Sequence, residues 1–451
     1  MRKAKAEMNT PIFDFVRKYA SDDGVRLHMP GHKGNAFLGC EQFDITEIKG
    51  ADELYAADGI IAESERNASA LFNTARTLYS TEGSSQCIRA MIYLAATESS
   101  EKRRRYVLAA RNVHKTFIYA LALCDIDVLW VSGKTDSVCS CEITACDVEK
   151  ALKSAEYPPI AVYVTSPDYL GRCLPIKEIA DVCHRYGTKL IVDNAHGAYL
   201  HFLPEKSHPI DLGADMCCDS AHKTLPSLTG GAYLHISKAA PEYYSETAKN
   251  AMALFGSTSP SYLILSSLDL CNRYLSDGFE AKIREKAKQI NNAKQVLADN
   301  GWDIITSESM KITILAPEGK SGTEIADFLR SSGFECEYAD EEYVVLMISC
   351  ETKESELLSF IGALGTNKLP ARKPKAFDIP ASSMAMTVRE AIFSPSETVP
   401  VSLSQGRVCA APTVSCPPAI PIAVSGEIIE EGHVALFNHY GIDEISVVKN
   451  K

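Results

Sequence analysis

Between residues 62 and 240 the sequence alternates between stretches with helical spacing of apolar residues and short, almost continuously apolar stretches. This alternation is typical of a mainly parallel sheet that helices cover on both faces, an α/β fold. In such a sheet, ligands bind at the carboxyl ends of the strands. The pattern predicts helices at 62–78, 88–97 and 176–186, and strands at 106–110, 128–131, 160–165 and 189–193.

The rest of the chain divides into further parts. We expect an N-terminal arm at 1–25 with a helix at 11–20, and a large domain at 26–245. A smaller α+β domain is expected at 246–368, followed by a proline-rich C-terminal domain at 369–451 that starts with a linker, 369–375. The smaller domain is predicted to contain helices at 277–300 and 323–332 and strands at 310–315 and 343–348.

Composition narrows the classes of function. The 451 residues carry a net charge of −12, and no pattern of basic and aromatic residues points to nucleic acid. No apolar run is long enough to cross a bilayer, and the first residues do not resemble a secretory leader. Fifteen cysteines are scattered without a C-x-x-C pair or metal-ligand spacing. We therefore expect a cytoplasmic protein with reduced thiols, no metal, and no nucleic-acid or membrane partner.

One lysine stands in an unusual place. Lys223 lies in a short polar segment, 220–231, between two apolar stretches that read as buried strands. A lysine in such a place is costly unless its amine is used, and a common use is a Schiff base with a carbonyl compound such as pyridoxal 5'-phosphate (PLP). Upstream, the predicted strand at 189–193 ends in Asp193, with His196 close behind; PLP chemistry needs a carboxylate on the pyridinium nitrogen. The alternative is a surface lysine and an ordinary Asp turn.

Three other predicted strand or helix ends carry polar side chains. Gly83, Ser84 and Ser85 precede a predicted helix, and such a glycine and hydroxyl set is suited to phosphate, although it is equally typical of a helix N-cap. His114 follows a strand and could stack on a cofactor ring or be an ordinary half-buried histidine. Ser166 follows Thr165, where hydroxyls could bond a phenolic oxygen or simply end the strand.

Several motifs carry a family resemblance. The chain resembles the Orn/Lys/Arg decarboxylase family, PLP enzymes of the aspartate-aminotransferase fold (fold type I), almost from end to end. The matching motifs are HMPGHKGN at 28–35, DITE at 44–47, ADELY at 51–55, GSS at 83–85, NVHK at 112–115, TSP at 165–167, DNAHG at 193–197, SAHKTLP at 220–226 and STSPSY at 257–262, with REA at 389–391, GR at 406–407 and CPPAIP at 416–421 in the tail.

The resemblance implies a role for each candidate residue. Lys223 would bind the aldehyde carbon of PLP, Asp193 would pair with the pyridinium nitrogen, and His114 would stack on the ring. Either Lys223 or His114 would return a proton to Cα after CO2 departs. The cofactor-binding set implied is Gly83, Ser84, Ser85, His114, Ser166, Asp193, His196, Ser220, His222 and Lys223, with Thr258 reaching in from the other subunit.

The chain also departs from the family pattern. Asn194 stands where the family usually has an acid, and Glu82 replaces the usual asparagine. In the tail, Cys416 replaces an aromatic residue, Ala419 a glycine and Ser425 a proline. The tail lines the substrate entrance in the family, so an acid for the substrate's distal cationic group is expected there. The candidates are Glu427, Asp52 and Glu47.

These features predict a decarboxylase of a basic amino acid, with arginine ahead of lysine and ornithine, that feeds polyamine metabolism. Because the chain resembles a short form without the family's N-terminal wing domain, we expect a homodimer or tetramer with active sites shared between subunits. Two alternatives stay open at this point. One is a PLP-dependent aminotransferase or lyase of a non-basic amino acid, which the tail departures favour; the other is a non-catalytic PLP-binding protein.

Overall fold

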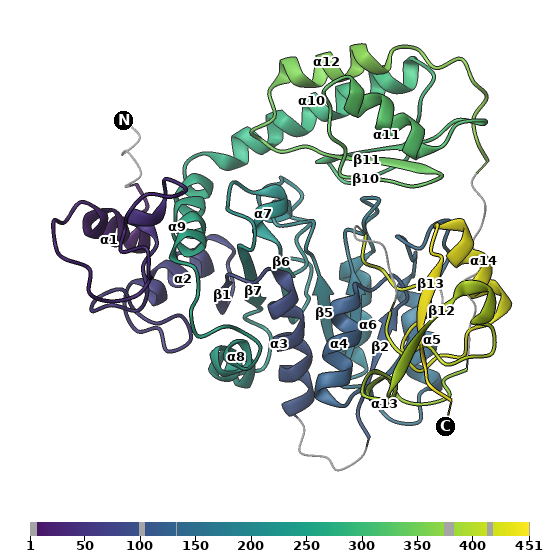
Figure 1. The fold of residues 1–451 in the computed structure, drawn as a ribbon, viewed down its shortest axis with the longest axis horizontal. Coiled ribbons are helices and arrows are strands. Elements are labelled where there is room, and N and C mark those ends of the chain that lie inside the picture. The colour runs from purple at the N-terminus through teal and green to yellow at the C-terminus, as the bar shows by residue number, and fades with distance from the viewer. Residues whose placement is uncertain (1–6, 99–103, 132, 374–382, 413–417, 451) are drawn as a thin grey trace. The chain divides into compact units, whose positions relative to one another are not determined.

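The computed structural model describes residues 7–98, 104–131, 133–373, 383–412 and 418–450. One mixed sheet of seven strands, mostly parallel, has the order β1-β7-β6-β5-β4-β2-β3 (Figure 1). The mainly parallel α/β sheet expected from the alternating pattern is therefore confirmed. The chain divides into two compact units, residues 1–98 with 191–284 and residues 99–190 with 285–451, and each is described by itself. The domain boundaries expected from the sequence stay predictions.

The first unit contains one end of the seven-stranded sheet, and at this end two of the strand pairs are antiparallel. In it β6 pairs in parallel with β5 and antiparallel with β7, and β7 pairs antiparallel with β1. Its elements are α1 (Pro11–Ala20), α2 (Ile60–Leu71), β1 (Arg76–Ser80), α3 (Ser84–Thr97), β6 (Met216–Asp219), α7 (Ala221–Thr224), β7 (Ala232–Ile236), α8 (Glu242–Leu254) and α9 (Tyr262–Ser276), and β5 (Lys189–Asp193) and α10 (Phe279–Asp299) cross its boundary.

The helix predicted at 62–78 is wrong in its second half. Helix α2 ends at Leu71, and Asn73 follows with a φ of +54°, a left-handed conformation that a helix cannot continue through. Residues 76–80 then form β1, in which Thr77 and Tyr79 lie opposite His235 and Tyr233 of β7. A β-branched and an aromatic side chain at alternate positions favour a strand, and pairing with β7 decides the outcome.

The second unit contains parallel strands of the seven-stranded sheet and two further sheets, one of four strands and one of two. Strand β2 pairs in parallel with β3 and with β4, and β10-β11-β9-β8 form a separate antiparallel sheet, with α10, α11 and α12 on one face (Figure 1). Its elements are β2 (Tyr106–Ala110), α4 (Lys115–Cys124), β3 (Asp127–Val131), α5 (Ala145–Ser154), β4 (Ala161–Thr165), α6 (Ile176–Arg185), β8 (Asp303–Ile304), β9 (Lys311–Leu315), α11 (Gly322–Ser331), β10 (Tyr338–Ala339), β11 (Tyr343–Met347), α12 (Glu354–Leu364), α13 (Val388–Ile392), β12 (Ser396–Pro400), a 3-10 helix (Val401–Leu403), α14 (Glu431–His439) and β13 (Glu444–Val448). The first unit has two further 3-10 helices, Glu41–Phe43 and Leu200–Phe202.

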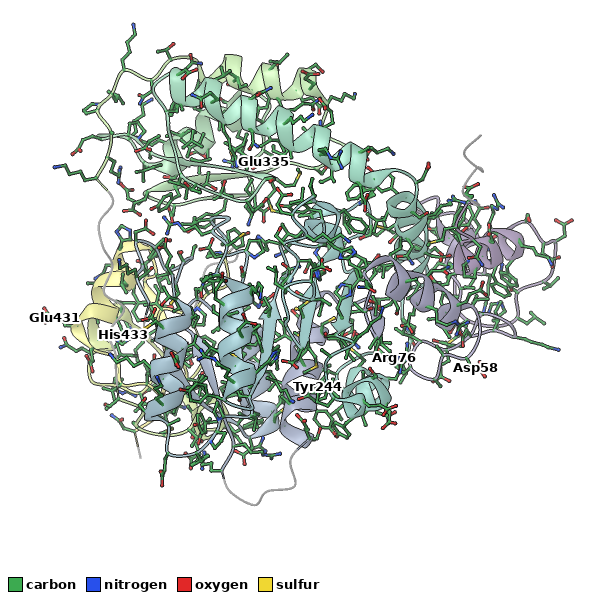
Figure 2. All side chains as sticks on the ribbon, turned by 180° about the vertical axis from the view of Figure 1, so that it is seen from behind. Asp58, Arg76, Tyr244, Glu335, Glu431 and His433 are labelled. Atoms are coloured by element: carbon green, nitrogen blue, oxygen red, sulfur yellow. The ribbon has the colours of Figure 1, made fainter. Side chains whose placement is uncertain are left out.

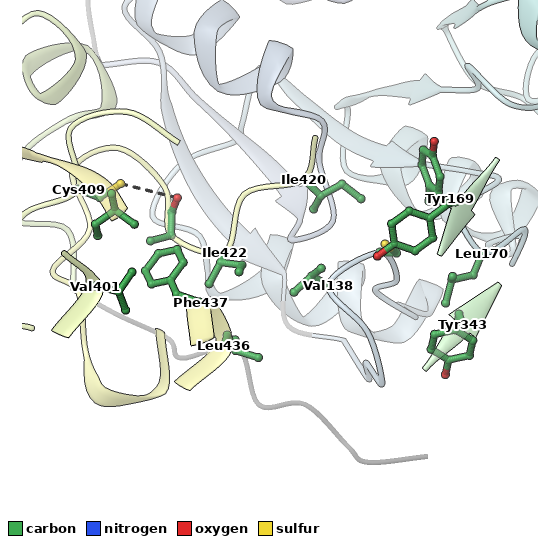
Figure 3. Packing of buried hydrophobic residues seen from close by; sticks show 14 of the residues in the cluster. Val138, Tyr169, Leu170, Tyr343, Val401, Cys409, Ile420, Ile422, Leu436 and Phe437 are labelled. Carbon is green, nitrogen blue, oxygen red and sulfur yellow. Dashed lines mark hydrogen bonds between the residues drawn. The ribbon is translucent and has the colours of Figure 1, made fainter. Parts of the chain in front are cut away.

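An apolar core joins the parts of the second unit. It draws Val138 and Leu170 from loops after β3 and β4, Tyr343 from β11, and Ile422 and Phe437 from the C-terminal segment (Figure 3). Because the C-terminal segment shares this core with the strand-end loops, its position beside those loops is fixed by packing. The described cysteines are free thiols, most of them buried, as the sequence predicts.

Candidate functional site

Lys223 lies on the short helix α7, directly after β6. The backbone N–H of Lys223 donates to the carbonyl of Ser220, which starts this turn. The Lys223 amine, Nζ, lies 2.8 Å from Nε2 of His196, whose side chain is buried. The turn and the imidazole together hold the amine at a defined place at the carboxyl end of β6.

Asp193 ends the neighbouring strand, β5. Its residue is only 3% exposed, and its Oδ1 accepts the backbone N–H of Ala195 and lies 3.6 Å from Sγ of Cys218. Cys218 is its partner in the register of β5 and β6. Since β5 and β6 run parallel, the acid at the end of β5 and the lysine after β6 belong to the same edge of the sheet.

Hydroxyl groups gather at the start of helix α3. Gly83 adopts a φ of +71°, which a glycine tolerates, and its N–H donates to the carbonyl of Gly230. Ser84 is the first residue of α3, and Ser220 Oγ donates to Ser84 Oγ at 3.0 Å. The start of a 14-residue helix and the hydroxyls of Ser84 and Ser220 form a place that is suited to a phosphate.

The first unit therefore offers the groups that PLP requires: an amine for the aldehyde, a buried carboxylate for the ring nitrogen and a helix start for the phosphate. Other predicted residues of this unit have definite positions. His222 Nδ1 lies 2.9 Å from the carbonyl of Gly231, and Thr258 is exposed in the loop between α8 and α9. The backbone N–H of Ser257 donates to Glu82, so the departure at Glu82 has a role in fixing this loop.

A buried hydrogen-bond network centred on Asp219 was not predicted. Its carboxylate accepts from Nδ2 of Asn194 at 2.7 Å, and Nε2 of His208 and Nε2 of His235 lie 3.1 and 3.0 Å away. Burial alone would raise the pKa of Asp219, but the two histidines hold it well below its usual value. The network thus links Asn194, which follows Asp193, to Asp219, which precedes Ser220. Asn194, where the family usually has an acid, therefore serves as a hydrogen-bond donor to Asp219.

His208, Cys217 and Asp219 also lie close enough together for metal ligands. The backbone N–H of Ile210 donates to Nδ1 of His208, which places the proton of this ring on Nε2, toward Asp219. The trio is therefore arranged as a hydrogen-bond network. Cys217 and Asp219 are two positions apart on β6 and so face the same side of the strand, which the sequence can predict. Their contact with His208 could not be predicted, because the conformation of the loop before β6 brings His208 to them.

In the second unit, the predicted residues lie at the ends of β2 and β4. His114 is the N-cap of α4, and its Nδ1 accepts the backbone N–H of Thr116. Ser166 follows β4 and is 3% exposed; its Oγ accepts the backbone N–H of Leu174. The ring of His114 is thus held in one orientation, with Nδ1 as an acceptor.

The predicted substrate acid Glu427 is buried, 1% exposed, beside Arg111. Arg111 Nη2 lies 3.1 Å from its Oε2, and the guanidinium also donates to the carbonyls of Pro421 and Ile422. The Trp130 ring lies 4.9 Å from the guanidinium carbon. Sequence reasoning missed Arg111, although it directly follows β2, because its partners lie more than 300 residues further along the chain.

The other two acid candidates have local partners. Asp52 accepts backbone N–H groups before and at the start of α2. Burial acts to raise its pKa, but the bonds from Glu53, Asp58 and Ile61 lower it overall. Glu47 accepts from Thr46 Oγ1. A distal-group role for Glu427, Asp52 or Glu47 stays a prediction.

Two of the tail departures have a structural setting. Ala419 has a φ of +58°, and its carbonyl accepts the backbone N–H of Lys115, the first residue of α4. Ser425 is fully buried. Cys416 lies outside the described residues. The left-handed conformation at position 419 explains in physical terms why glycine suits this position.

Comparison with known proteins identifies the family. A family model described as Orn/Lys/Arg decarboxylase, major domain, matches residues 10–317. The chain belongs to the Orn/Lys/Arg decarboxylase family. An arginine decarboxylase of Halalkalibacterium halodurans is 29% identical over 94% of this chain and 92% of its own length.

Solved structures support the fold assignment of this family member. A lysine decarboxylase of Francisella novicida, LdcF, superposes with a TM-score of 0.81 at 16% identity, over 98% of this chain and 81% of that one. A structure of SPT with PLP is similar at a TM-score of 0.56 and 14% identity, over 70% of this chain and 79% of its own. None of the described helices combines the length and apolar character needed to span a bilayer.

Proposed function

We propose that this family member decarboxylates a basic L-amino acid with PLP as cofactor, arginine ahead of lysine and ornithine. The observation that carries the proposal is the amine of Lys223 held at His196, on the sheet edge where β5 ends in the buried Asp193. The name of the Halalkalibacterium relative supports arginine. The products would be CO2 and the corresponding amine, a precursor class for polyamines.

When bound, PLP supplies an electron sink for the electron pair that remains on Cα as CO2 departs. Asp193 would keep the ring nitrogen protonated, and its burial strengthens this interaction. Ser84, Ser220 and the start of α3 would hold the phosphate, with Gly83, Ser85 and His222 in the same set. His114 would stack on the ring, with Ser166 close to its phenolic oxygen.

Residues of the protein would also supply the proton that Cα takes up after CO2 departs. His196 positions the Lys223 amine, and Lys223 would deliver a proton to Cα from this place. His114 is the second candidate donor, through Nε2, because its Nδ1 accepts from Thr116. A pH profile of single-turnover product formation in a His114→Asn variant separates the two donors.

We further propose a homodimer or tetramer in which Thr258 contributes to the neighbouring active site. Its exposure in a loop anchored by Glu82 supports this role. Light scattering that shows a monomer at assay concentrations would contradict the proposal.

The decisive experiment is a substrate panel. PLP-loaded protein is supplied with arginine, lysine, ornithine and a set of non-basic amino acids, and CO2 and amine are measured together. Release of both from arginine at the highest kcat/KM is expected. No release from any basic amino acid, with turnover of another, would overturn the proposal in favour of an aminotransferase or lyase. That second candidate is favoured by one observation: the Glu427 carboxylate is already paired with Arg111.

A further inference from the structure

The buried network around Asp219 lies between the two segments that carry the groups proposed to hold PLP. Asp219 is the last residue of β6, and Ser220 and Lys223 follow it in the chain. Its Oδ1 accepts the Nδ2–H of Asn194 at 2.7 Å, and Asn194 directly follows Asp193, the end of β5. Asp219 is therefore adjacent to one segment along the chain and hydrogen-bonded to the other.

The four side chains at the centre of the network, those of Asp219, Asn194, His208 and His235, are fully buried. Burial would raise the pKa of Asp219, but the two histidines lower it overall, so the carboxylate is ionised. Its Oδ1 accepts the amide of Asn194, and its Oδ2 lies 3.1 and 3.0 Å from Nε2 of the two histidines. Because a buried charge is costly without its donors, these contacts hold Asp219 in one place.

The Asn194 side of the network fixes the turn after β5. The backbone N–H of Asn194 donates to the carbonyl of Cys218, and its own carbonyl accepts the N–H of Gly197. A Cβ at Gly197 would lie 2.1 Å from Oδ1 of Asn194, so the amide fills the inside of the turn. Asp193 and His196 stand on either side of it in the chain. A shift of Asn194 would therefore displace both Asp193 and His196.

The other side of the network lies at the start of the segment that carries Lys223. In the register of β6 and β7, Asp219 lies opposite Tyr233. The hydroxyl of the next residue, Ser220, donates to Ser84 Oγ at the start of α3, and its carbonyl accepts the N–H of Lys223. A shift of Asp219 would thus displace Ser220 and the turn that carries Lys223.

A second buried acid of the same unit has partners of another kind. Asp269 of α9 is fully buried, and its Oδ2 accepts the backbone N–H groups of Ile12 and Phe13, 2.9 and 3.0 Å away. These contacts join α1 to α9 and serve packing. The contacts of Asp219 instead join residues that adjoin the groups assigned to PLP. Asp269 is therefore a matched control for burial and hydrogen bonding alone.

We infer that Asp219 is a positioning residue of the PLP site, and that it acts on Asp193 through Asn194. The inference rests on the proposed function, because the groups that it positions are those assigned to PLP. An acid at position 194 would bring two carboxylates within hydrogen-bond distance, and their like charges would repel. The amide that this chain carries there, where the family usually has an acid, is what permits the contact.

The test measures PLP binding without turnover, by absorbance titration of the cofactor-free protein. Asn194→Leu keeps a similar volume but removes the donor, and we expect about tenfold weaker PLP binding, the loss of one hydrogen bond to a charged group. A ring nitrogen that Asp193 holds less firmly withdraws less charge from the bond to the lysine. The pH at which the absorbance of bound PLP changes should therefore rise, by about 0.5.

An exchange of the two side chains tests the contact itself. Asn194→Asp alone should weaken PLP binding at least about tenfold, because it pairs two carboxylates. With Asp219→Asn added, the amide Nδ2 at position 219 can donate to the carboxylate at 194, while its Oδ1 still accepts from both histidines. We expect this double variant to bind PLP within about threefold of the wild type.

The control variant is Asp269→Asn, which should lower stability to urea but leave both PLP binding and the absorbance profile unchanged. Wild-type PLP binding in both single variants of Asn194 would overturn the inference. So would a double variant as weak as Asn194→Asp, or an equal loss of PLP binding in Asp269→Asn. Asn194→Leu adds no charge and decides the test if Asn194→Asp does not fold.

The two levels of the argument fail separately. A wild-type protein that binds no PLP would overturn the proposed function and this inference with it. A wild-type protein that binds PLP, with variants that bind it equally well, would overturn the inference alone. The substrate panel tests the reaction independently of either result.

Discussion

Lys223 of the first unit and Arg111 of the second are both cations held away from bulk water, but they have different partners. The half-buried Lys223 amine lies beside an imidazole, that of His196. The buried Arg111 guanidinium has a carboxylate, two carbonyls and an indole face around it. The Arg111 guanidinium is held in the structure by these several buried partners, whereas the Lys223 amine lies beside a titratable imidazole at the edge of the sheet.

The largest expected effect tests the reactive side of this comparison. Lys223→Ala should lower kcat by about a thousandfold or more, because it would remove both the proposed cofactor-binding amine and a proposed proton donor. The melting temperature of the cofactor-free protein should change little, since Lys223 is half-buried and no apolar core residue is removed. Lys238→Ala, an exposed lysine of the same unit, should retain full activity. Activity in Lys223→Ala close to wild type would refute the assigned role.

Arg111→Met tests the structural side. Removal of one partner from a buried pair leaves Glu427 as an uncompensated charge and should cost about 3–5 kcal/mol of unfolding free energy. The double variant Arg111→Met with Glu427→Met should recover most of this loss, because neither charge remains. Urea unfolding of the four proteins measures the coupling. If the single variant is as stable as the double variant, the pair has no structural role.

Gly197→Ala tests how tightly the turn that carries His196 is packed. A Cβ at position 197 would meet Oδ1 of Asn194 at 2.1 Å and Cδ1 of Leu200 at 2.6 Å, so the turn must shift. We expect a loss of about 1–3 kcal/mol, with weaker PLP binding as the Lys223–His196 contact is disturbed. Gly362→Ala, where a Cβ on helix α12 meets open space, is the control and should be neutral or stabilising.

The surroundings of Lys223 and of Arg111 also differ in how far the sequence predicts them. Lys223 and Asp193 were predicted because each follows an apolar strand, and parallel strands bring such residues to one edge. The pair of Arg111 and Glu427 was not, because 316 positions separate the partners and only tertiary packing joins them. The same limit explains β1, where pairing with β7 outweighs the apparent helical spacing.

The pH dependence of the unfolding free energy should reveal a buried histidine, His433, close to Arg111. Burial, and then the nearby Arg111, lower the pKa of His433 on α14 to about 4 (Figure 2). In the unfolded chain this histidine would take up its proton near pH 6.5, so the unfolded state binds more protons between these values. Stability is therefore full above about pH 6.5 and falls, on the order of 1–2 kcal/mol, as the pH approaches 4. In His433→Gln this part of the acid destabilisation should disappear; an unchanged pH profile would contradict the assignment.

The smallest effect concerns the backbone that brings the C-terminal segment to Arg111. Ala419 has a φ of +58°, which costs an L-residue about 1–2 kcal/mol, whereas glycine adopts it freely but loses more entropy on folding. The two terms nearly cancel, and Ala419→Gly should stabilise the protein by no more than about 1 kcal/mol. Because the carbonyl at this position accepts the N–H of Lys115 beside His114, kcat is expected to stay within about twofold. A loss of stability in Ala419→Gly, measured by urea unfolding, would mean that position 419 is not left-handed in solution.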